Sequence, residues 1–358
     1  MTASTAAADS SRIQTYDFMR GLAILGVIAI HAVALFPSSS ATLKTLLNLG
    51  HFGVQLFFFV SAMTMCHMWQ LRQHENARTR KFFIRRMMRI APLFWLAIPL
   101  YLLVDGTAPS YWAPDGIDAR QIVLTATFLH GFWPDSLNSV VPGGWSIAVE
   151  MTFYLVFPLL ISRIGNTTHF LWLAVAAFFA NELLIAPAMV SFFSAHYHAH
   201  SDTLIGNFLY YNFFNQLPIF FLGMAIYHKH TPGLKPALAW LALAAALTAL
   251  HVIEPKSLFF LLAVLALHYA VTFIVRHGIN SFVLNELGRY SYAIYLSHFL
   301  VIRWIAGWLA GLTRFSNLEA ALGILATAAL SYLVARALAI TVEKGSHSLT
   351  RRWVGALG

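Results

Sequence analysis

Long apolar runs separated by short polar loops are the dominant pattern along this chain. A helix that crosses a bilayer needs about 20 mostly apolar residues, and ten runs meet this requirement. They are 18–36, 46–68, 86–104, 145–164, 169–190, 210–228, 235–252, 256–276, 289–310 and 318–342. A further stretch, 120–134, is apolar but short, and it predicts a re-entrant or interfacial helix. The pattern therefore predicts an all-α, polytopic membrane protein with about ten transmembrane helices.

The composition supports the bilayer as the solvent of this chain. Of the 358 residues, 59% are hydrophobic and only 10% are charged, whereas soluble domains carry about 25% charged residues. A soluble chain this apolar could not cover itself with polar surface, and its many aliphatic and aromatic residues exclude disorder. The single cysteine, Cys66, excludes an internal disulfide. We expect a multi-pass protein of the plasma membrane, the inner membrane of a bacterium.

The distribution of basic residues sets the expected orientation. Lys and Arg are concentrated in the loop that follows the second run, between Arg72 and Arg89. Because cytoplasmic loops are enriched in these residues, the loop should be cytoplasmic, and ten spans then place both termini in the cytoplasm. The net charge of +9 fits contact with membrane lipids rather than nucleic acid. We expect a disordered tail over 1–15, one transmembrane domain over 16–345 and a basic cytoplasmic tail over 346–358.

Ionisable residues inside apolar runs are functional candidates, because charge is costly within a bilayer. Arg20 and His31 both lie in the first run, and their spacing puts them on one helix face about 16 Å apart in height. Glu150 lies near the start of the fourth run, at a depth comparable with His31. An imidazole beside a carboxylate is a general-base pair, so His31 and Glu150 are the candidate catalytic residues. The alternatives are snorkelling for Arg20 and structural hydrogen bonds for the other two.

Two groups of residues at the ends of the runs are candidates for binding. Arg86 and Arg89, in FFIRRMMRIAPLFW, share a helix face at the predicted cytoplasmic mouth of the third run. Guanidinium groups suit phosphate, although a positive-inside loop would look the same. The candidate substrate-binding residues are Trp145, Ser146, Tyr295 and His298. Tyr and Trp at such positions are also common as interface anchors.

Motifs of several other enzyme classes are missing from the sequence. It has no Walker loop, no HExxH and no GxSxG, which argues against nucleotide hydrolysis, zinc proteolysis and an α/β-hydrolase nucleophile. His196, His198 and His200 alternate in a predicted outside loop, but without a carboxylate frame they predict no metal site. Glu182 and Arg303 also lie within runs, and the sequence assigns neither of them a role.

Several segments together resemble the integral-membrane acyltransferase 3 family. YDFMRGLAILGVIAIHA carries Arg20, ten further residues and His31, which is the family's hallmark in its first span. The other matching segments, in order, are HFGVQLFFFVSA, RRMMRIAPLFW, WSIAVEMTFYLVFPLL, LPIFFLGMAIY, LGRYSYAIYLSHFLVI and TVEKG. They extend over nearly the whole chain. Gln55 stands where the family usually has Asp, Ala62 where it has Gly, and Gly345 where it has Pro.

The resemblance implies transfer of an acyl group, usually acetyl, from cytoplasmic acyl-CoA to a hydroxyl of an extracytoplasmic glycan. Such acceptors include the O-antigen of lipopolysaccharide, exopolysaccharide and peptidoglycan. Acyl-CoA is then a co-substrate, and no cofactor is bound permanently. The implied partners are the glycan, or a lipid-linked saccharide, and membrane lipids. Many relatives add an SGNH hydrolase domain, for which this chain has no room.

A mechanism consistent with the residues follows. Arg20, Arg86 and Arg89 would hold the CoA phosphates, while His31, assisted by Glu150, would deprotonate the acceptor hydroxyl. Direct transfer and a covalent acyl-histidine are both compatible with these residues. The main alternative function is a transporter or flippase of a glycan or another polar substrate, which would also need buried charges. The sequence shows no inverted repeat to support it.

Overall fold

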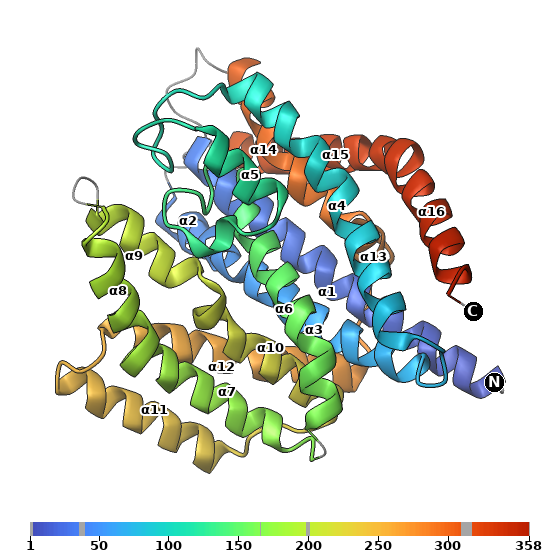
Figure 1. The fold of residues 1–358 in the computed structure, drawn as a ribbon, viewed down its shortest axis with the longest axis vertical. Coiled ribbons are helices and arrows are strands. Elements are labelled where there is room, and N and C mark those ends of the chain that lie inside the picture. Colours follow the sequence, from blue (N-terminus) through green and yellow to red (C-terminus); the bar gives the residue numbers. More distant parts are fainter. Residues whose placement is uncertain (1–2, 36–39, 165, 198–200, 309–316, 358) are drawn as a thin grey trace. The chain divides into compact units, whose positions relative to one another are not determined.

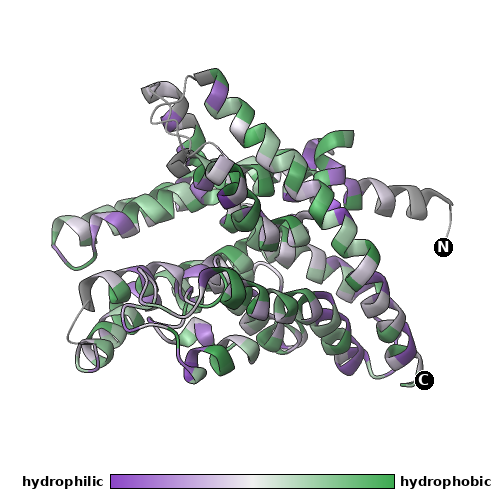
Figure 2. Ribbon diagram, turned by 90° about the horizontal axis from the view of Figure 1, so that it is seen from above, coloured by the Kyte–Doolittle hydropathy of each residue, from purple (hydrophilic) through white to green (hydrophobic). Residues whose placement is uncertain are grey.

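The computed structural model (Figure 1) describes residues 3–35, 40–164, 166–197, 201–308 and 317–357 of the chain. Regular structure within these ranges is helical, apart from one isolated β-bridge between Ser110 and Ala113. The predicted all-α class is therefore confirmed. Hydrophobic residues cover most of the helices, and hydrophilic residues gather in several loops and at helix ends (Figure 2).

The chain divides into two compact units. Unit one comprises Met1–Val60, Ile84–Phe94 and Ile274–Gly358, and unit two comprises Ser61–Phe83 and Trp95–Phe273. Helices α3 (Gly53–Leu71), α4 (Arg78–Asp105) and α12 (Pro255–His277) contribute residues to both units. The single transmembrane domain predicted over 16–345 is thus spread over the two units.

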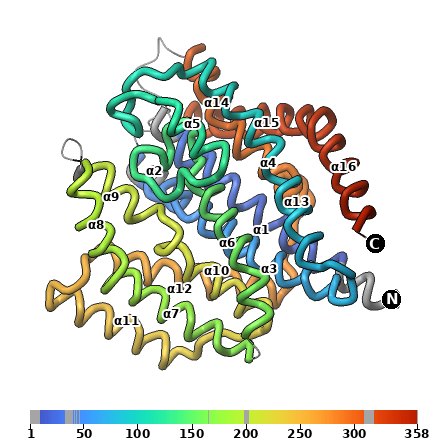
Figure 3. The backbone as a smooth tube through the Cα atoms, viewed as in Figure 1, coloured from blue at the N-terminus to red at the C-terminus, as the bar shows by residue number. Residues whose placement is uncertain are grey.

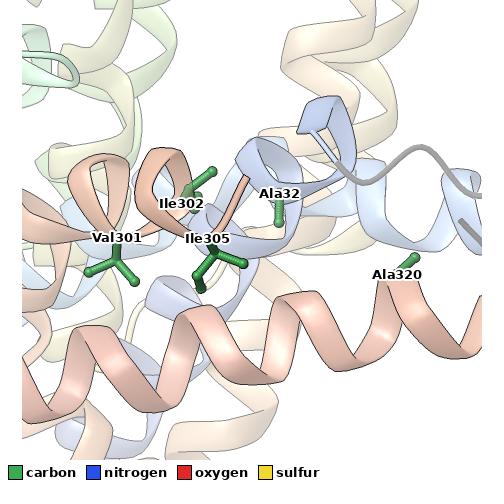
Figure 4. Packing of buried hydrophobic residues seen from close by; sticks show 5 residues of the cluster. All are labelled: Ala32, Val301, Ile302, Ile305 and Ala320. Atoms are coloured by element: carbon green, nitrogen blue, oxygen red, sulfur yellow. The ribbon is translucent and has the colours of Figure 1, made fainter. Parts of the chain in front are cut away.

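Unit one is built around the long helix α1. Its elements, besides parts of α3, α4 and α12, are α1 (Ala3–Leu35), α2 (Ala41–Asn48), the 3-10 helix η1 (Leu49–Phe52), α13 (Phe282–Arg289), α14 (Ser291–Trp308), α15 (Asn317–Leu338), the π-helix η4 (Ala339–Glu343) and α16 (Lys344–Gly355). An apolar cluster joins three of these helices: Ala32 of α1, Val301, Ile302 and Ile305 of α14, and Ala320 of α15 (Figure 4). The cluster holds the end of α1 that carries His31 against α14.

Two glycines allow α1 and α13 to pack backbone against backbone (Figure 3). A Cβ atom on Gly21 would lie 2.1 Å from the carbonyl oxygen of Leu284, and one on Gly288 would lie 1.8 Å from that of Asp17. No side chain could fit at either position without moving a helix. Small residues allow such close approach of membrane helices, and here the approach brings the last residue of α13, Arg289, up to Asp17.

The part of α4 that belongs to unit one is tied to α14 and α16 through its backbone. Pro92 has no N–H, so it leaves the carbonyl of Met88 without its helical partner. The Ser346 hydroxyl in α16 donates to that carbonyl. The Tyr292 hydroxyl in α14 donates to the Ile90 carbonyl at 2.6 Å. These bonds fix the arginine-bearing turn of α4.

Unit two contains the remaining helices. They are α5 (Ala119–Ala126), the 3-10 helix η2 (His130–Phe132), α6 (Gly144–Arg163), α7 (His169–Ala180), the π-helix η3 (Asn181–Ile185), α8 (Ala186–Ser194), α9 (Ser201–Tyr211), α10 (Phe213–Tyr227) and α11 (Leu234–Ala249). The short stretch predicted over 120–134 corresponds to α5 and η2. A capping box of Asp118 and Gln121 begins α5. Helix α7 packs against α10.

Within the described ranges, seven helical segments are long and apolar enough to cross a membrane. They are Ser10–Ala32, Leu49–Leu71, Arg78–Asp105, Gly144–Arg163, His169–Ser194, Pro255–His277 and Leu318–Gly355. The three other predicted runs, 210–228, 235–252 and 289–310, contain the shorter helices α10, α11 and α14, of 15, 16 and 18 residues. Multi-pass character is confirmed, whereas the count of ten and the cytoplasmic termini stay predictions.

Three elements differ in detail from the predicted runs. Asn212 interrupts the run 210–228, because its side chain accepts hydrogen bonds from the backbone N–H groups of Phe214 and Asn215 and so begins α10. Helix α1 already begins at Ala3, within the stretch expected to be a disordered tail. Helix α16 covers much of the expected basic tail.

Candidate active site

Arg20 lies in α1 and is held by a carboxylate one turn earlier. Its Nη1 donates to Asp17 Oδ1 at 2.8 Å, and only 12% of either side chain is exposed. The other carboxylate oxygen of Asp17 lies 3.9 Å from Nε of Arg289. Asp17 therefore bridges two guanidinium groups, one from α1 and one from α13. Asp17 and Arg289 were not predicted as site residues, although an acidic residue three positions before a buried Arg was a usable signal in the sequence.

The two predicted arginines of α4 belong to the same group of charges. The charges of Arg89 and Arg86 act on the Arg20 guanidinium. Arg86 is buried, with 8% of the residue exposed, whereas Arg89 is exposed. Arg89 also interacts electrostatically with Glu343 of η4. Unit one thus brings together the three predicted anion-binding arginines, Arg20, Arg86 and Arg89, which form the arginine cluster. Their charges converge on one region, which is suited to an anion with several negative oxygens.

Three turns further along α1, His31 lies beside His298 of α14. Their ring centroids are 5.4 Å apart, and Phe299 lies 4.4 Å from His31 and 4.1 Å from His298. Nδ1 of His298 lies 2.6 Å from the Tyr295 carbonyl oxygen. A carbonyl only accepts, so Nδ1 carries the proton and Nε2 of the neutral ring keeps its lone pair. His298 is fully buried, and its Nε2 has no hydrogen-bond partner within the described residues.

Tyr295 lies at the same site, and its backbone carbonyl makes the hydrogen bond with His298. The Tyr295 ring lies 5.7 Å from that of His298 and meets Phe57 of α3 edge-on at 6.3 Å. His51 of η1 lies close enough to His31 for their charges to interact. Two of the predicted substrate-binding residues, Tyr295 and His298, thus lie beside the predicted base. Sequence reasoning missed His51, whose closeness depends on the glycine-mediated packing of η1 against α1.

Glu150, the other predicted catalytic residue, lies in unit two. One of its oxygens, Oε1, accepts hydrogen bonds from Ser61 Oγ at 2.5 Å and from the Tyr154 hydroxyl. Tyr154 lies one turn further along α6, and Ser61 lies in α3. Both donors were missed from the sequence, although an i,i+4 pair on a helix was predictable. His31 belongs to unit one, so the pairing of His31 with Glu150 stays a prediction.

The start of α6 holds the two remaining predicted binding residues. The Trp145 ring packs against that of Tyr211, with centroids 4.5 Å apart. The Ser146 hydroxyl donates to the Gly143 carbonyl at 3.0 Å, within its own turn. Nε2 of His130 lies 3.0 Å from the Gly144 carbonyl, and burial lowers the pKa of His130 to about 4. The hydroxyl hydrogen of Ser146 is thus used within the local turn.

Of the three alternating histidines in the predicted outside loop, the structure describes only His196. His196 Nδ1 lies 2.7 Å from the Phe192 carbonyl, and His198 and His200 lie outside the described residues. In the parts of the chain that the structure describes, no group of three His, Cys, Asp or Glu could hold a metal ion.

Comparison with known proteins gives the family. The sequence profile of the acyltransferase domain matches residues 13–336. Acyltransferase MdmB of Streptomyces mycarofaciens is 28% identical over 95% of this chain and 93% of its own length. Staphylococcus aureus (strain COL) SACOL0978, which its name describes provisionally as an O-acetyltransferase, is 28% identical over 40% of this chain and 24% of its own length. Exopolysaccharide production protein ExoZ of Rhizobium meliloti (strain 1021) is 27% identical over 31% and 34%. No solved structure gives a significant match.

The long apolar helices and the profile match together define a multi-pass membrane enzyme that transfers a chemical group. The profile covers most of the chain, and the matched region contains both the arginine cluster and the histidine pair. The chain belongs to the acyltransferase domain family and is an O-acyltransferase. The family resemblance inferred from the sequence motifs is confirmed.

Proposed function

We propose that this enzyme moves an acyl group, typically acetyl, from cytoplasmic acyl-CoA to a hydroxyl of an extracytoplasmic glycan. In this proposal it works in the inner membrane of a bacterium with both termini in the cytoplasm. The acceptor is a glycan such as O-antigen, exopolysaccharide or peptidoglycan, or a lipid-linked saccharide. The names of two relatives support these choices, because one refers to O-acetylation and another to exopolysaccharide production.

The arginine cluster of unit one is the proposed docking site for the CoA diphosphate. Arg20, Arg86 and Arg89 supply forked donors that match phosphate oxygens. Asp17 Oδ1 lies 2.8 Å from Nη1 of Arg20 and fixes this guanidinium. Its negative charge also offsets the repulsion among the arginines when no anion is bound. The position of Arg89, exposed at its end of the cluster, gives a charged ligand a route to the buried members.

The histidine pair is the proposed site of chemistry. His31 accepts the proton of the acceptor hydroxyl, and the oxygen attacks the thioester carbonyl carbon. The carbon–sulfur bond then breaks, and the departing CoA thiolate takes the proton from the imidazolium. Nε2 of His298, with its lone pair fixed by the Tyr295 carbonyl, accepts a hydrogen bond from a neighbouring hydroxyl of the acceptor and so orients the attacking group. Glu150, oriented by Ser61 and Tyr154, is proposed to stabilise the imidazolium.

One observation carries the proposal most strongly. A single helix, α1, bears Arg20 within the arginine cluster and His31 beside a second buried histidine. The offset of eleven positions from Arg20 to His31 corresponds to a rise of about 16 Å, so an anchored CoA headgroup and a reacting thioester occupy separate ends of one rigid element. A transporter does not need a general base held at a fixed distance from a phosphate site.

The test is acylation of surface glycans in a deletion strain. The strain is complemented with wild type, His31→Ala or His74→Ala, a control that changes an exposed loop histidine. All proteins are matched for amount in the membrane, and base-labile acyl groups are measured by mass spectrometry. We expect wild type and His74→Ala to restore acylation. His31→Ala should lower it by at least about a hundredfold, because general-base catalysis contributes roughly 10²–10⁴-fold.

Two results would overturn parts of this proposal. Full acylation with His31→Ala would show that His31 is structural. No acylation with wild type, together with acetyl transfer from acetyl-CoA to a small hydroxylated acceptor by the purified protein, would exclude the glycan and leave the transferase.

A further inference from the structure

A cavity of about 180 Å³ in unit two lies apart in sequence from the residues assigned above. Four segments line it: the turn of η3 and α8, the end of α9 with the start of α10, the connection from α11 to α12, and the first residues of α12. Its walls are mostly apolar. Pockets for drug-sized ligands measure about 300–1,000 Å³, so this cavity is suited to one small ring or an equivalent group.

The polar part of the cavity is a carboxylate with two donors of its own. Glu182 Oε2 accepts from the Ser257 hydroxyl, and Glu182 Oε1 accepts from Asn181 Nδ2 at 3.0 Å. A π-helical segment carries Asn181 and Glu182 in the middle of a span that otherwise consists of α7 and α8. Such π segments occur frequently at functional sites. A carboxylate in an apolar span is costly and indicates function.

Besides the Glu182 carboxylate, the side chain of Asn181 has an acceptor oxygen, Oδ1, in the wall of the cavity. Its Nδ2 lies within 3.4 Å of Asn215 Oδ1 as well as close to Glu182. Both of these neighbours are acceptors, so the assignment of nitrogen and oxygen in the Asn181 amide is fixed. The Asn181 side chain is 2% exposed, and its Oδ1 has no hydrogen-bond partner in the described part of the chain. An unmatched buried acceptor is costly, so the fold keeps this polar group beside the cavity at the expense of stability.

The chemistry of the walls narrows the ligand. Each Glu182 oxygen has a lone pair beyond the one that its own donor uses, and neighbouring hydroxyls of a ligand can donate to these. The aromatic rings of Tyr210 and Phe260 line the same cavity, with centroids 5.9 Å apart. A sugar ring combines hydroxyl donors at its edge with apolar C–H faces, and it fits both kinds of wall. A ligand that carries a carboxylate would be repelled by the carboxylate of Glu182.

We propose that this cavity binds one neutral saccharide ring through the Glu182 carboxylate, which Asn181 and Ser257 orient. Its use as a subsite for the acceptor rests on the proposed function, whereas the ligand class is argued from the cavity alone. The exposed ion pair of Lys256 and Glu254, at 2.6 Å, lies on the rim.

The experiment is saturation-transfer NMR with the purified full-length protein in a detergent that contains no sugar. The probes are D-glucose, D-galactose and N-acetyl-D-glucosamine, with D-glucuronate and cyclohexylamine as an anionic and a cationic comparison. Val190→Trp fills the cavity from an exposed wall position without touching the polar groups. Glu182→Gln keeps the shape and removes the charge. Glu254→Gln, on the exposed rim, is the matched control.

We expect at least one neutral sugar to show transfer with wild type and with Glu254→Gln. The signal should vanish in Val190→Trp, and the affinity should fall about tenfold in Glu182→Gln, because the charged acceptor is lost. Glucuronate should not bind. The proposal is overturned if no neutral sugar binds, if binding survives Val190→Trp, or if only cyclohexylamine binds.

Failure of the saccharide site and failure of the proposed acyl-transfer reaction give different results. Acetyl transfer from acetyl-CoA is measured on the same samples. Sugar binding without any acyl transfer would leave the saccharide site and refute the proposed reaction. Normal glycan acylation by Val190→Trp, together with loss of the sugar signal that wild type gives, would refute the use of the cavity as an acceptor subsite and leave the saccharide site.

Discussion

The contact between α1 and α13 gives a sharp test of how the arginine cluster is assembled. In Gly288→Ala, the new Cβ would lie 1.8 Å from the Asp17 carbonyl oxygen, whereas real contacts of this kind are at least about 3 Å. The two backbones must therefore separate by roughly 1 Å. Ala gains about 0.5–1 kcal/mol over Gly in a helix, and overpacking costs about 1–3 kcal/mol or more. Because the obstructing atom is backbone, we expect the upper end of that cost and a net loss of about 2 kcal/mol.

The matched control is Gly345→Ala in α16, where an added Cβ meets nothing within 4 Å. This variant should be as stable as wild type or slightly more stable. Thermal unfolding in detergent compares the two, and acyl-CoA titration of the activity gives a second readout. Gly288→Ala should raise the KM for acyl-CoA, since Asp17 sets the position of Arg20. If Gly288→Ala unfolds at the same temperature as Gly345→Ala, the close helix contact is not present in the folded protein and the reasoning fails.

Two further predictions concern buried polar groups. Burial lowers the pKa of His130 from 6.5 to about 4, so protonation opposes folding. Stability should be full above pH 6.5 and fall by about 3 kcal/mol as the pH drops towards 4. In His130→Gln, which cannot be charged, urea unfolding should lose this part of the pH dependence, and an unchanged pH profile would contradict the assignment. Ser346→Ala should cost about 1–3 kcal/mol, because it leaves the Met88 carbonyl without a donor. Unfolding midpoints test this, and a change below about 0.5 kcal/mol would refute it.

The sequence predicts the helical architecture well where apolar runs are long and uniform. The runs around α1, α3, α4, α6 and α12 each overlap one helical segment that is long enough to span a bilayer. The prediction is weaker where a polar side chain competes with the helix for backbone groups. Asn212 ends one helix and begins the next inside a run whose average hydrophobicity hides the break. Likewise, a hydrophobicity scan cannot locate the π-helical turn at Asn181, because a π turn changes hydrogen bonding without changing composition.

The candidate site divides in the same way between local and tertiary information. The shared face of Arg20 and His31 follows from helix geometry, and the positive character of the α4 turn follows from composition. The partners of these residues depend on packing between distant segments. His298 lies beside His31 because the apolar cluster holds α14 against the end of α1. Arg289 lies close to Asp17 because Gly288 has no side chain to keep α13 away from α1. No spacing rule along the chain contains these contacts.

The two histidines also show why backbone contacts matter for the chemistry of this site. His31 and His298 are neighbours, and a proton on the facing nitrogen of both rings would give two donors and no base. The Tyr295 carbonyl removes this ambiguity for His298, because it binds Nδ1 and leaves the lone pair on Nε2. The tautomer is thus set by a backbone atom one turn away, which no side-chain substitution of Tyr295 can remove. A sequence motif reveals that a tyrosine precedes the histidine by three positions, but the atom that determines the protonation state is one that every residue type has at that position.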